Sequence, residues 1–202
     1  IFFKSILFGI TPPFLAHSYK FVISFLLHLS NWLLFASGLY YNKDMEKSIK
    51  ILVISNTKGN IGPILTALDK EHPDVIFHLG GGVRDLSELN FRGKIYAVRS
   101  GGEFGKRLPT ATKISFGSEM MLLSHGDGWS IKDKQKLADF AAAQGATLLL
   151  VGCDDEPTYF EQNGIKFICP GSLHDRMTAT YAGIEMDEAG GLDIQHRKLI
   201  DA

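Results

Sequence analysis

Short apolar runs, each followed by a polar or glycine-rich loop, recur along the chain from Ile49 onward and limit the folds that it can adopt. Ile49–Ser55 and Thr147–Val151 are nearly continuous runs of this kind, which is typical of strands buried on both faces of a sheet. Gly117-Ser118 separates two further runs and indicates a hairpin. The other predicted strands are Val75–Leu79, Lys94–Arg99, Thr112–Phe116, Glu119–Ser124, a piece from Tyr159, Ile165–Ile168, Thr180–Met186 and Leu192–Arg197.

Two helices are predicted between these strands. Asn60 is a good N-cap for a helix that runs through Leu68 with one apolar face, and Pro73 ends that unit. Ile131–Gln144 has helical periodicity, and Gly145 is the expected C-cap. The pattern therefore predicts an α/β fold in which helices cover two sheets.

Ligands of open α/β sheets bind at the loops that follow the carboxyl ends of the strands. Any site in this chain is therefore expected on such loops. The five loops are Asn56–Asn60, Gly80–Asp85, Ser100–Glu103, Ser124–Asp127 and Gly152–Pro157.

The composition suits one sizeable core and argues against one class of partner. A chain of 202 residues with 45% hydrophobic residues fits a single domain once its N-terminal segment is set aside. Lys and Arg total 21 against 22 Asp and Glu, so the charge balance does not indicate a nucleic-acid binder. Cys153 and Cys169 are too few for a disulfide framework and favour a reducing, cytoplasmic compartment.

Residues 1–44 differ sharply in composition from the domain predicted over residues 45–202. Phe21–Tyr41 is apolar or small at nearly every position and is long enough to span a bilayer as a helix. The favoured interpretation is that this segment is a start-site artefact and that the functional protein begins at Met45. The alternatives are a membrane anchor that leaves the domain in the cytoplasm and, with poorer flanks, a signal peptide.

The loops carry short motifs that follow one another in a characteristic order. They are Ile54-Ser55-x-Thr57-x-Gly59-Asn60, His78-Leu79-Gly80 with Val83-Arg84-Asp85, Val98-Arg99 with Phe104-Gly105, His125-Gly126, Gly152 with Glu156-Pro157, and Pro170-Gly171-Ser172. In this framework the chain resembles the calcineurin-like metallophosphoesterases over nearly all of residues 48–200. The closest resemblance is to the small archaeal and bacterial phosphodiesterase group that includes the small retromer subunit. It implies a two-sheet metallophosphoesterase sandwich flanked by helices.

Such enzymes hold two divalent ions, which generate a hydroxide near neutral pH and clamp both oxygens of an in-line displacement at phosphorus. The family uses seven Asp, His and Asn ligands. Carried onto this chain, those positions hold Asn56, Lys58, Gly81, Gly101, His125, Cys153 and Asp155. Only His125 keeps its ligand type. The resemblance therefore implies a degenerate dimetal site with lost or strongly impaired phosphodiesterase activity, and no cofactor is expected.

Three of the replacements oppose metal binding most directly. Gly81 has no side chain where the bridging carboxylate belongs, and Gly101 removes a ligand to the second ion. Lys58 would add Coulomb repulsion of several kcal/mol next to the first ion.

Without cations, the pocket is expected to repel a phosphodiester, because Glu103, Asp127 and Asp155 would surround the single Lys58. Glu103 stands where the family usually has Asp, and Asp127 stands where a second His would follow.

Two interpretations of the altered site remain open. In one, His125, Cys153, Asp155 and Asp127 form a rewired site for one divalent metal, either zinc or manganese. In the other, an ion pair between Lys58 and Asp155 replaces the metal as the tie between the first and last loops. His125 is then a loop histidine that is hydrogen-bonded to the backbone.

Three functions follow from these interpretations. The favoured one is a non-catalytic binding or scaffold protein, with an unidentified protein partner and with membrane contact only if residues 1–44 belong to it. The alternative is a residual phosphodiesterase that uses the rewired single-metal site. The third is an inactivated variant, natural or engineered, without any selected activity.

Overall fold

The computed structural model describes residues 48–103 and 108–200. The predicted N-terminal segment over residues 1–44 and the Phe104-Gly105 motif lie outside the described residues. Within residues 48–103 and 108–200, no helix is both long and apolar enough to cross a membrane.

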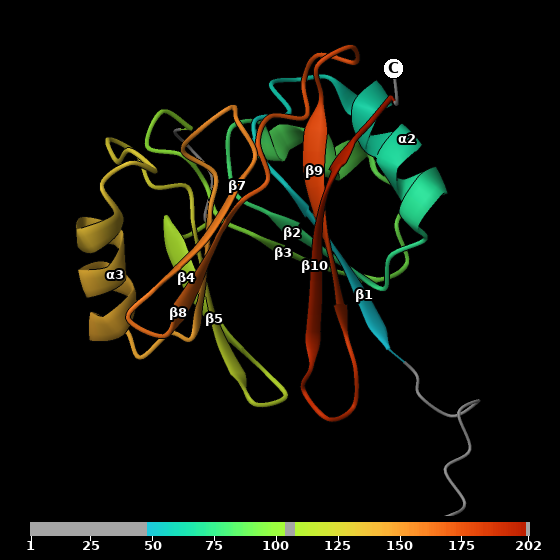
Figure 1. Cartoon of the computed structure of the whole chain (residues 1–202). Coiled ribbons are helices and arrows are strands. Elements are labelled where there is room, and N and C mark those ends of the chain that lie inside the picture. The colour runs from blue at the N-terminus through green and yellow to red at the C-terminus, as the bar shows by residue number, and fades with distance from the viewer. Residues whose placement is uncertain (1–47, 104–107, 201–202) are drawn as a thin grey trace, which may run out of the picture. The chain divides into compact units, whose positions relative to one another are not determined.

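Two five-stranded sheets face each other, with α3 on the outer side of one sheet and α2 on the outer side of the other (Figure 1). The predicted two-sheet α/β sandwich flanked by helices is therefore confirmed. The first sheet has the order β10 (Leu192–Lys198), β9 (Thr180–Met186), β1 (Ile49–Ile54), β2 (Val75–His78), β3 (Lys94–Ala97). The second has the order β4 (Ala111–Phe116), β5 (Glu119–Ser124), β6 (Leu148–Val151), β8 (Ile165–Cys169), β7 (Thr158–Gln162).

Both faces of β1 are buried, which explains its nearly unbroken apolar sequence. Ile51 and Val53 point into the core between the sheets, whereas Leu52 and Ile54 pack on the side that α2 covers. Because side chains alternate along a strand, a polar residue at any of these positions would be buried in one core or the other.

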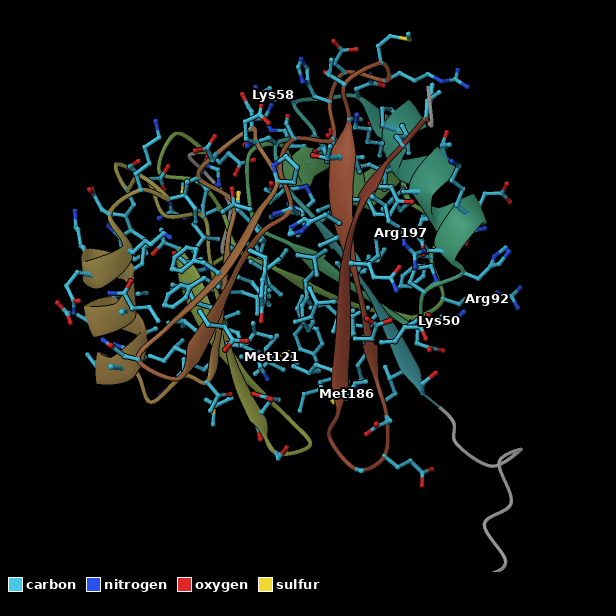
Figure 2. The ribbon with its side chains drawn as sticks, viewed as in Figure 1. Lys50, Lys58, Arg92, Met121, Met186 and Arg197 are labelled. Atoms are coloured by element: carbon cyan, nitrogen blue, oxygen red, sulfur yellow. The ribbon has the colours of Figure 1, made fainter. Side chains whose placement is uncertain are left out.

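The core between the sheets is apolar throughout. Met121 of β5 and Met186 of β9 enter it from opposite sheets (Figure 2). A separate cluster between the second sheet and α3 includes Leu137 and Phe167, both of which are fully buried. Stability of the sandwich thus comes mainly from apolar burial away from the loops.

The helices agree with the sequence except at the start of α3. α2 (Ile61–Glu71) begins as predicted, with the Asn60 side chain accepting a hydrogen bond from the Gly62 amide. α3 (Lys134–Ala143) begins three residues later than the predicted Ile131. Ile131 is buried beside α3, so its apolar side chain matches the helical periodicity although its backbone lies in the preceding turn. A 3₁₀ helix over Val83–Glu88 was not predicted.

Parallel pairing brings the loops together at one edge of the sandwich. β1, β2 and β3 are parallel neighbours in one sheet, as are β5, β6 and β8 in the other. Just beyond the strands, backbone hydrogen bonds continue between loops, from the Asn56 amide to the Gly80 carbonyl at 2.9 Å and from Gly152 to Ser124 at 3.1 Å. The predicted loop edge therefore exists in the structure.

A buried polar network lies directly below this edge. The fully buried His78 accepts a hydrogen bond from the Gly80 amide at Nδ1, so its neutral ring carries the proton on Nε2. Nε2 donates to Thr57 Oγ1 at 3.2 Å, and the Thr57 hydroxyl donates to Asp85 Oδ2 at 2.6 Å. The network links the loop after β1 to the 3₁₀ helix that follows β2.

The neutral state of His78 predicts how stability depends on pH. Burial lowers the pKa of His78 to about 4, from an ordinary value of 6.5. Between these values the unfolded chain binds a proton that the folded chain excludes, so stability falls as the pH drops. We expect a loss of roughly 3 kcal/mol in the free energy of unfolding between about pH 7 and pH 4.

Urea unfolding of the wild type and His78→Gln across this pH range measures the effect. Glutamine cannot titrate but keeps one donor and one acceptor, so the variant should show a flatter profile. If the free energy of unfolding fell equally with pH in the two proteins, His78 would not be the group that excludes the proton.

Candidate functional site

Five of the seven positions predicted as metal ligands line one cavity of about 370 Å³ at the loop edge. Those five are Asn56, Lys58, His125, Cys153 and Asp155. Figure 2 shows Lys58 at this edge, at the end of the molecule that carries the loops. The other two positions, Gly81 and Gly101, have no side chain. Their backbone amides donate hydrogen bonds to Glu103 and Asp127.

Asn56 fills the space that a side chain at position 81 would need. Its backbone is in the left-handed region, with φ 52°. Its amide nitrogen donates to the Gly152 carbonyl at 3.2 Å and to Asp155 Oδ1 at 3.3 Å, which joins a loop of the first sheet to a loop of the second. A Cβ atom built on Gly81 would lie only 2.3 Å from Asn56 Oδ1. The place of a bridging carboxylate is therefore occupied by a neutral amide.

Lys58 and Asp155 form the ion pair expected from the sequence, with Nζ 3.8 Å from Oδ1. Their side chains are 48% and 66% exposed, so the pair lies in solvent and not in a buried pocket. Exposed pairs contribute little, because water screens the charges and two flexible side chains must be held. The ion pair lies where the first and last loops meet, but it contributes little to holding them together.

His125 is hydrogen-bonded to the backbone, as expected. Its Nδ1 donates to the Leu79 carbonyl at 2.8 Å, which joins the two sheets. Its Nε2 lies 3.6 Å from Asp127 Oδ1, and the other oxygen of Asp127 accepts a hydrogen bond from the Gly101 amide at 2.7 Å. Asp127 therefore turns toward the backbone of Gly101, the position at which the family ligand to the second ion is missing from the sequence.

Cys153 has the environment of a small apolar side chain. It packs against the cluster between the second sheet and α3. Burial raises the pKa of the Cys153 thiol to about 12, whereas zinc binds the thiolate. Within the described part of the chain, no group of three or more His, Cys, Asp and Glu residues is placed to hold a metal ion. The rewired four-residue site stays a prediction.

Glu103 has a role that the sequence did not reveal. Its carboxylate accepts hydrogen bonds from the amides of Gly81, Gly82 and Val83 and from the amide and hydroxyl of Ser100, at 2.7–3.2 Å. Partial burial alone would raise the pKa of Glu103, but the four backbone hydrogen bonds lower it to about 2. This carboxylate, which the sequence predicts as part of the negative charge around Lys58, is bound in the structure by backbone amides of the loops after β2 and β3.

The available donors do not fit a pair of divalent ions. Bridging ions need a carboxylate between them, but the position that should supply it is Gly81, and Asn56 fills the space beside it. Asp154, Asp155 and Asp127 are described carboxylates at or beside the cavity, and each accepts a hydrogen bond from an amide. The loops at this edge are linked to one another by hydrogen bonds.

The contact between Gly81 and Asn56 predicts a difference between two glycine substitutions. Gly81→Ala and Gly128→Ala both place a side chain in the left-handed region, at φ 75° and 71°. A Cβ on Gly128 meets no atom within 4 Å, whereas one on Gly81 clashes with Asn56. We expect Gly81→Ala to lower the free energy of unfolding by about 1–3 kcal/mol more than Gly128→Ala, as in overpacked sites. Denaturant unfolding of both variants measures it, and equal losses would contradict the contact.

Because the Lys58–Asp155 pair is exposed, substitution of either residue is expected to have a small effect on the free energy of unfolding. Lys58→Met should change the free energy of unfolding by less than about 1 kcal/mol, because the stranded Asp155 stays in water. Thermal unfolding at low and high salt measures this, with Asp155→Asn as the reciprocal variant. A larger loss from Lys58→Met would show that the pair is shielded from solvent.

Comparison with known proteins agrees with this fold. The sequence profile of the calcineurin-like phosphoesterase superfamily domain matches residues 49–189. A conserved protein of Streptococcus pneumoniae, described as a predicted phosphoesterase, is 23% identical with a TM-score of 0.54. That alignment covers 74% of this chain and 98% of the other.

Two further solved structures have the same fold. An archaeal phosphodiesterase is 18% identical with a TM-score of 0.58, and the alignment covers 74% of this chain and 100% of that one. The vacuolar protein sorting 29 protein of Entamoeba histolytica, solved with zinc, is 17% identical with a TM-score of 0.54, over 75% of this chain and 100% of that one. The comparison with curated proteins finds no match. With the profile matched over most of its length, this chain belongs to the calcineurin-like phosphoesterase superfamily.

Proposed function

We propose that this chain is a non-catalytic binding or scaffold protein built on the phosphoesterase fold. The observation that carries the proposal is the position of Asn56 Oδ1, since this atom of a neutral amide lies 2.3 Å from a Cβ atom built on Gly81, where a bridging carboxylate would begin. Solved structures of the same fold include an archaeal phosphodiesterase and a vacuolar protein sorting protein. The fold therefore occurs in proteins with different named roles.

The chemistry of phosphodiester cleavage supports the proposal. A metal-bound water becomes a hydroxide near neutral pH only because the cations stabilise its negative charge. Among the described residues that line the cavity, Lys58 is the one Lys or Arg, and it is already paired with Asp155. A protonated ammonium cannot stabilise a hydroxide and clamp two phosphate oxygens as two divalent ions do.

The alternative is a residual phosphodiesterase with one metal. His125 Nε2 and Asp127 Oδ1 lie 3.6 Å apart and could both turn toward an ion. Cys153 and Asp155 would have to complete the site, but burial raises the pKa of the Cys153 thiol and Asp155 is engaged by Asn56. This alternative needs both of these residues to reorganise, so it ranks second.

The residues at the replaced positions have partners at the loop edge, which argues against an enzyme disabled by directed removal of its ligands. Asn56 donates to Asp155, Asp155 pairs with Lys58, and the Gly101 amide donates to Asp127. Ligands removed one by one would leave groups without partners, whereas each of these finds a partner in another loop. The arrangement fits a site that has been rebuilt for a role without metal.

Metal content and hydrolysis measured on the full chain test the proposal. Purified protein should carry metal well below one equivalent and should show no turnover of a chromogenic phosphodiester with added manganese or nickel. The reason is the missing bridging carboxylate.

His125→Ala is the matched control, because His125 is the one position that keeps its ligand type. Any background turnover should be equal in the wild type and in this variant. Turnover that a chelator abolishes and His125→Ala removes would replace the proposal with the single-metal phosphodiesterase.

A further inference from the structure

β10 is an edge strand of the first sheet, and among the described residues β9 is its one strand partner. Near the turn between them, the Asp187 amide donates to the Gly191 carbonyl at 3.1 Å. At the other end of the ladder, the Leu199 amide donates to the Ala179 carbonyl at 2.9 Å. Hydrogen-bonded and non-hydrogen-bonded pairs alternate along an antiparallel ladder, so the odd-numbered residues of β10 are bonded to β9. The amides and carbonyls of its even-numbered residues therefore point to the open side of the strand.

Within the described residues, β10 is the longest edge strand of the two sheets. It has seven residues in continuous register with β9, whereas β3, β7 and β4 have four, five and six. α3 packs beside β7, where Gln162 Nε2 donates to Gln135 Oε1 at 2.9 Å. A long and regular edge strand is a template for pairing with a further strand. Of these four strands, β10 alone carries both acidic and basic side chains.

Asp193, Gln195 and Arg197 form an ordered row on one face of β10. This face is opposite to that of Ile194, which packs against the core between the sheets. Gln195 Nε2 donates to Asp193 Oδ2 at 2.8 Å, and Arg197 Nη2 donates to Gln195 Oε1 at 3.1 Å. Arg197 is also bound by Glu71 of α2, beside which it lies in Figure 2. Two opposite charges are therefore held on the two sides of Gln195, each two residues away.

We infer that β10 pairs antiparallel with β10 of a second copy of this chain, about a two-fold axis at Gln195. Gln195 is the middle residue of β10, so this register pairs the strand along its full length. Ile194 then lies opposite His196 of the second copy, and Leu192 lies opposite Lys198 of that copy. These even-numbered residues carry the amides and carbonyls that point to the open side, so the two strands exchange backbone hydrogen bonds.

Charge complementarity favours a second copy as the occupant of this edge. Asp193 lies opposite Arg197 of the second copy, and the two-fold axis repeats the contact. Both are non-hydrogen-bonded pairs, in which side chains approach most closely and opposite charges stabilise the pairing. A guanidinium has five N–H donors, so Arg197 can bind this carboxylate and still keep Glu71. Moving the axis by one residue would place Asp193 opposite Gln195 or Leu199 and would separate the charges.

The pairing has a consequence for a binding or scaffold protein. Antiparallel pairing about a two-fold axis turns the second copy end for end, so the two loop edges of the dimer face in opposite directions. Such a dimer can hold two partners at once. This consequence rests on the proposed function, whereas the pairing of β10 does not.

Single-cysteine substitutions in the full chain test the register. Opposed residues of a non-hydrogen-bonded pair have Cα atoms about 4.5 Å apart, which a disulfide can bridge. With oxidised glutathione as the oxidant, Gln195→Cys should therefore form a disulfide-linked dimer, seen by non-reducing electrophoresis. Asp193→Cys is the matched control on the same face, and it should not cross-link because its opposite residue is Arg197. Equal cross-linking of both variants, or none above wild type in Gln195→Cys, would overturn the inference.

Sedimentation equilibrium of the full chain tests the association itself. The wild type should reach twice the chain mass of 22.3 kDa. Asp193→Lys places like charges opposite each other twice and should raise the Kd of the dimer at least about tenfold. Glu188→Lys makes the same charge change at an exposed position in the turn between β9 and β10, and it should leave the Kd unchanged.

A chain that stays monomeric would overturn the inference and leave an extended peptide as the occupant of this edge. Equal weakening by Asp193→Lys and Glu188→Lys would overturn it as well. Metal-dependent diester turnover by a dimeric chain would instead contradict the proposed function alone, and a monomer without turnover would contradict the pairing alone.

Discussion

Closure of the strand-end loops is the constraint on which the rest of this structure depends. Two sheets with parallel strands place five loops along one edge, where backbone amides and carbonyls extend past their strand partners. Such groups must find other partners or remain costly. In this chain Asn56, His125 and Glu103 supply them, each by hydrogen bonds to the backbone of another loop. Direct hydrogen bonds therefore join these loops to one another.

The fold tolerates changes at the loop edge because its stability comes mainly from its apolar clusters. Apolar side chains fill the space between the sheets, and two further clusters lie under the helices. None of these clusters depends on a charged group at the loop edge. Residues on the loops can therefore change while the strands beneath them keep their register, so the family fold alone does not fix the chemistry at the loop edge.

The sequence predicted the framework better than the site. Buried strands such as β1 and the N-cap at Asn60 follow from local patterns, and the structure agrees with both. The start of α3 was wrong because Ile131 is apolar and in phase with the helix but lies in a turn. The hydrogen bond of His125 to the backbone was correct. The role of Glu103 was missed, because its partners are main-chain amides, which no residue type marks; only the run of glycines at 80–82 hinted at them.

The residues at the family's ligand positions contact one another across the loop edge. Loss of ligands alone is compatible with decay, in which each vacated position loses its partners independently. Here the residues at these positions contact one another: Asn56 Oδ1 lies where a side chain at Gly81 would begin, and the Asn56 amide nitrogen donates to the Gly152 carbonyl and to Asp155. A side chain restored at position 81 would require the Asn56 side chain to shift. The loop edge is therefore a surface whose loops are joined by direct hydrogen bonds, and this is the property on which the proposed binding role rests.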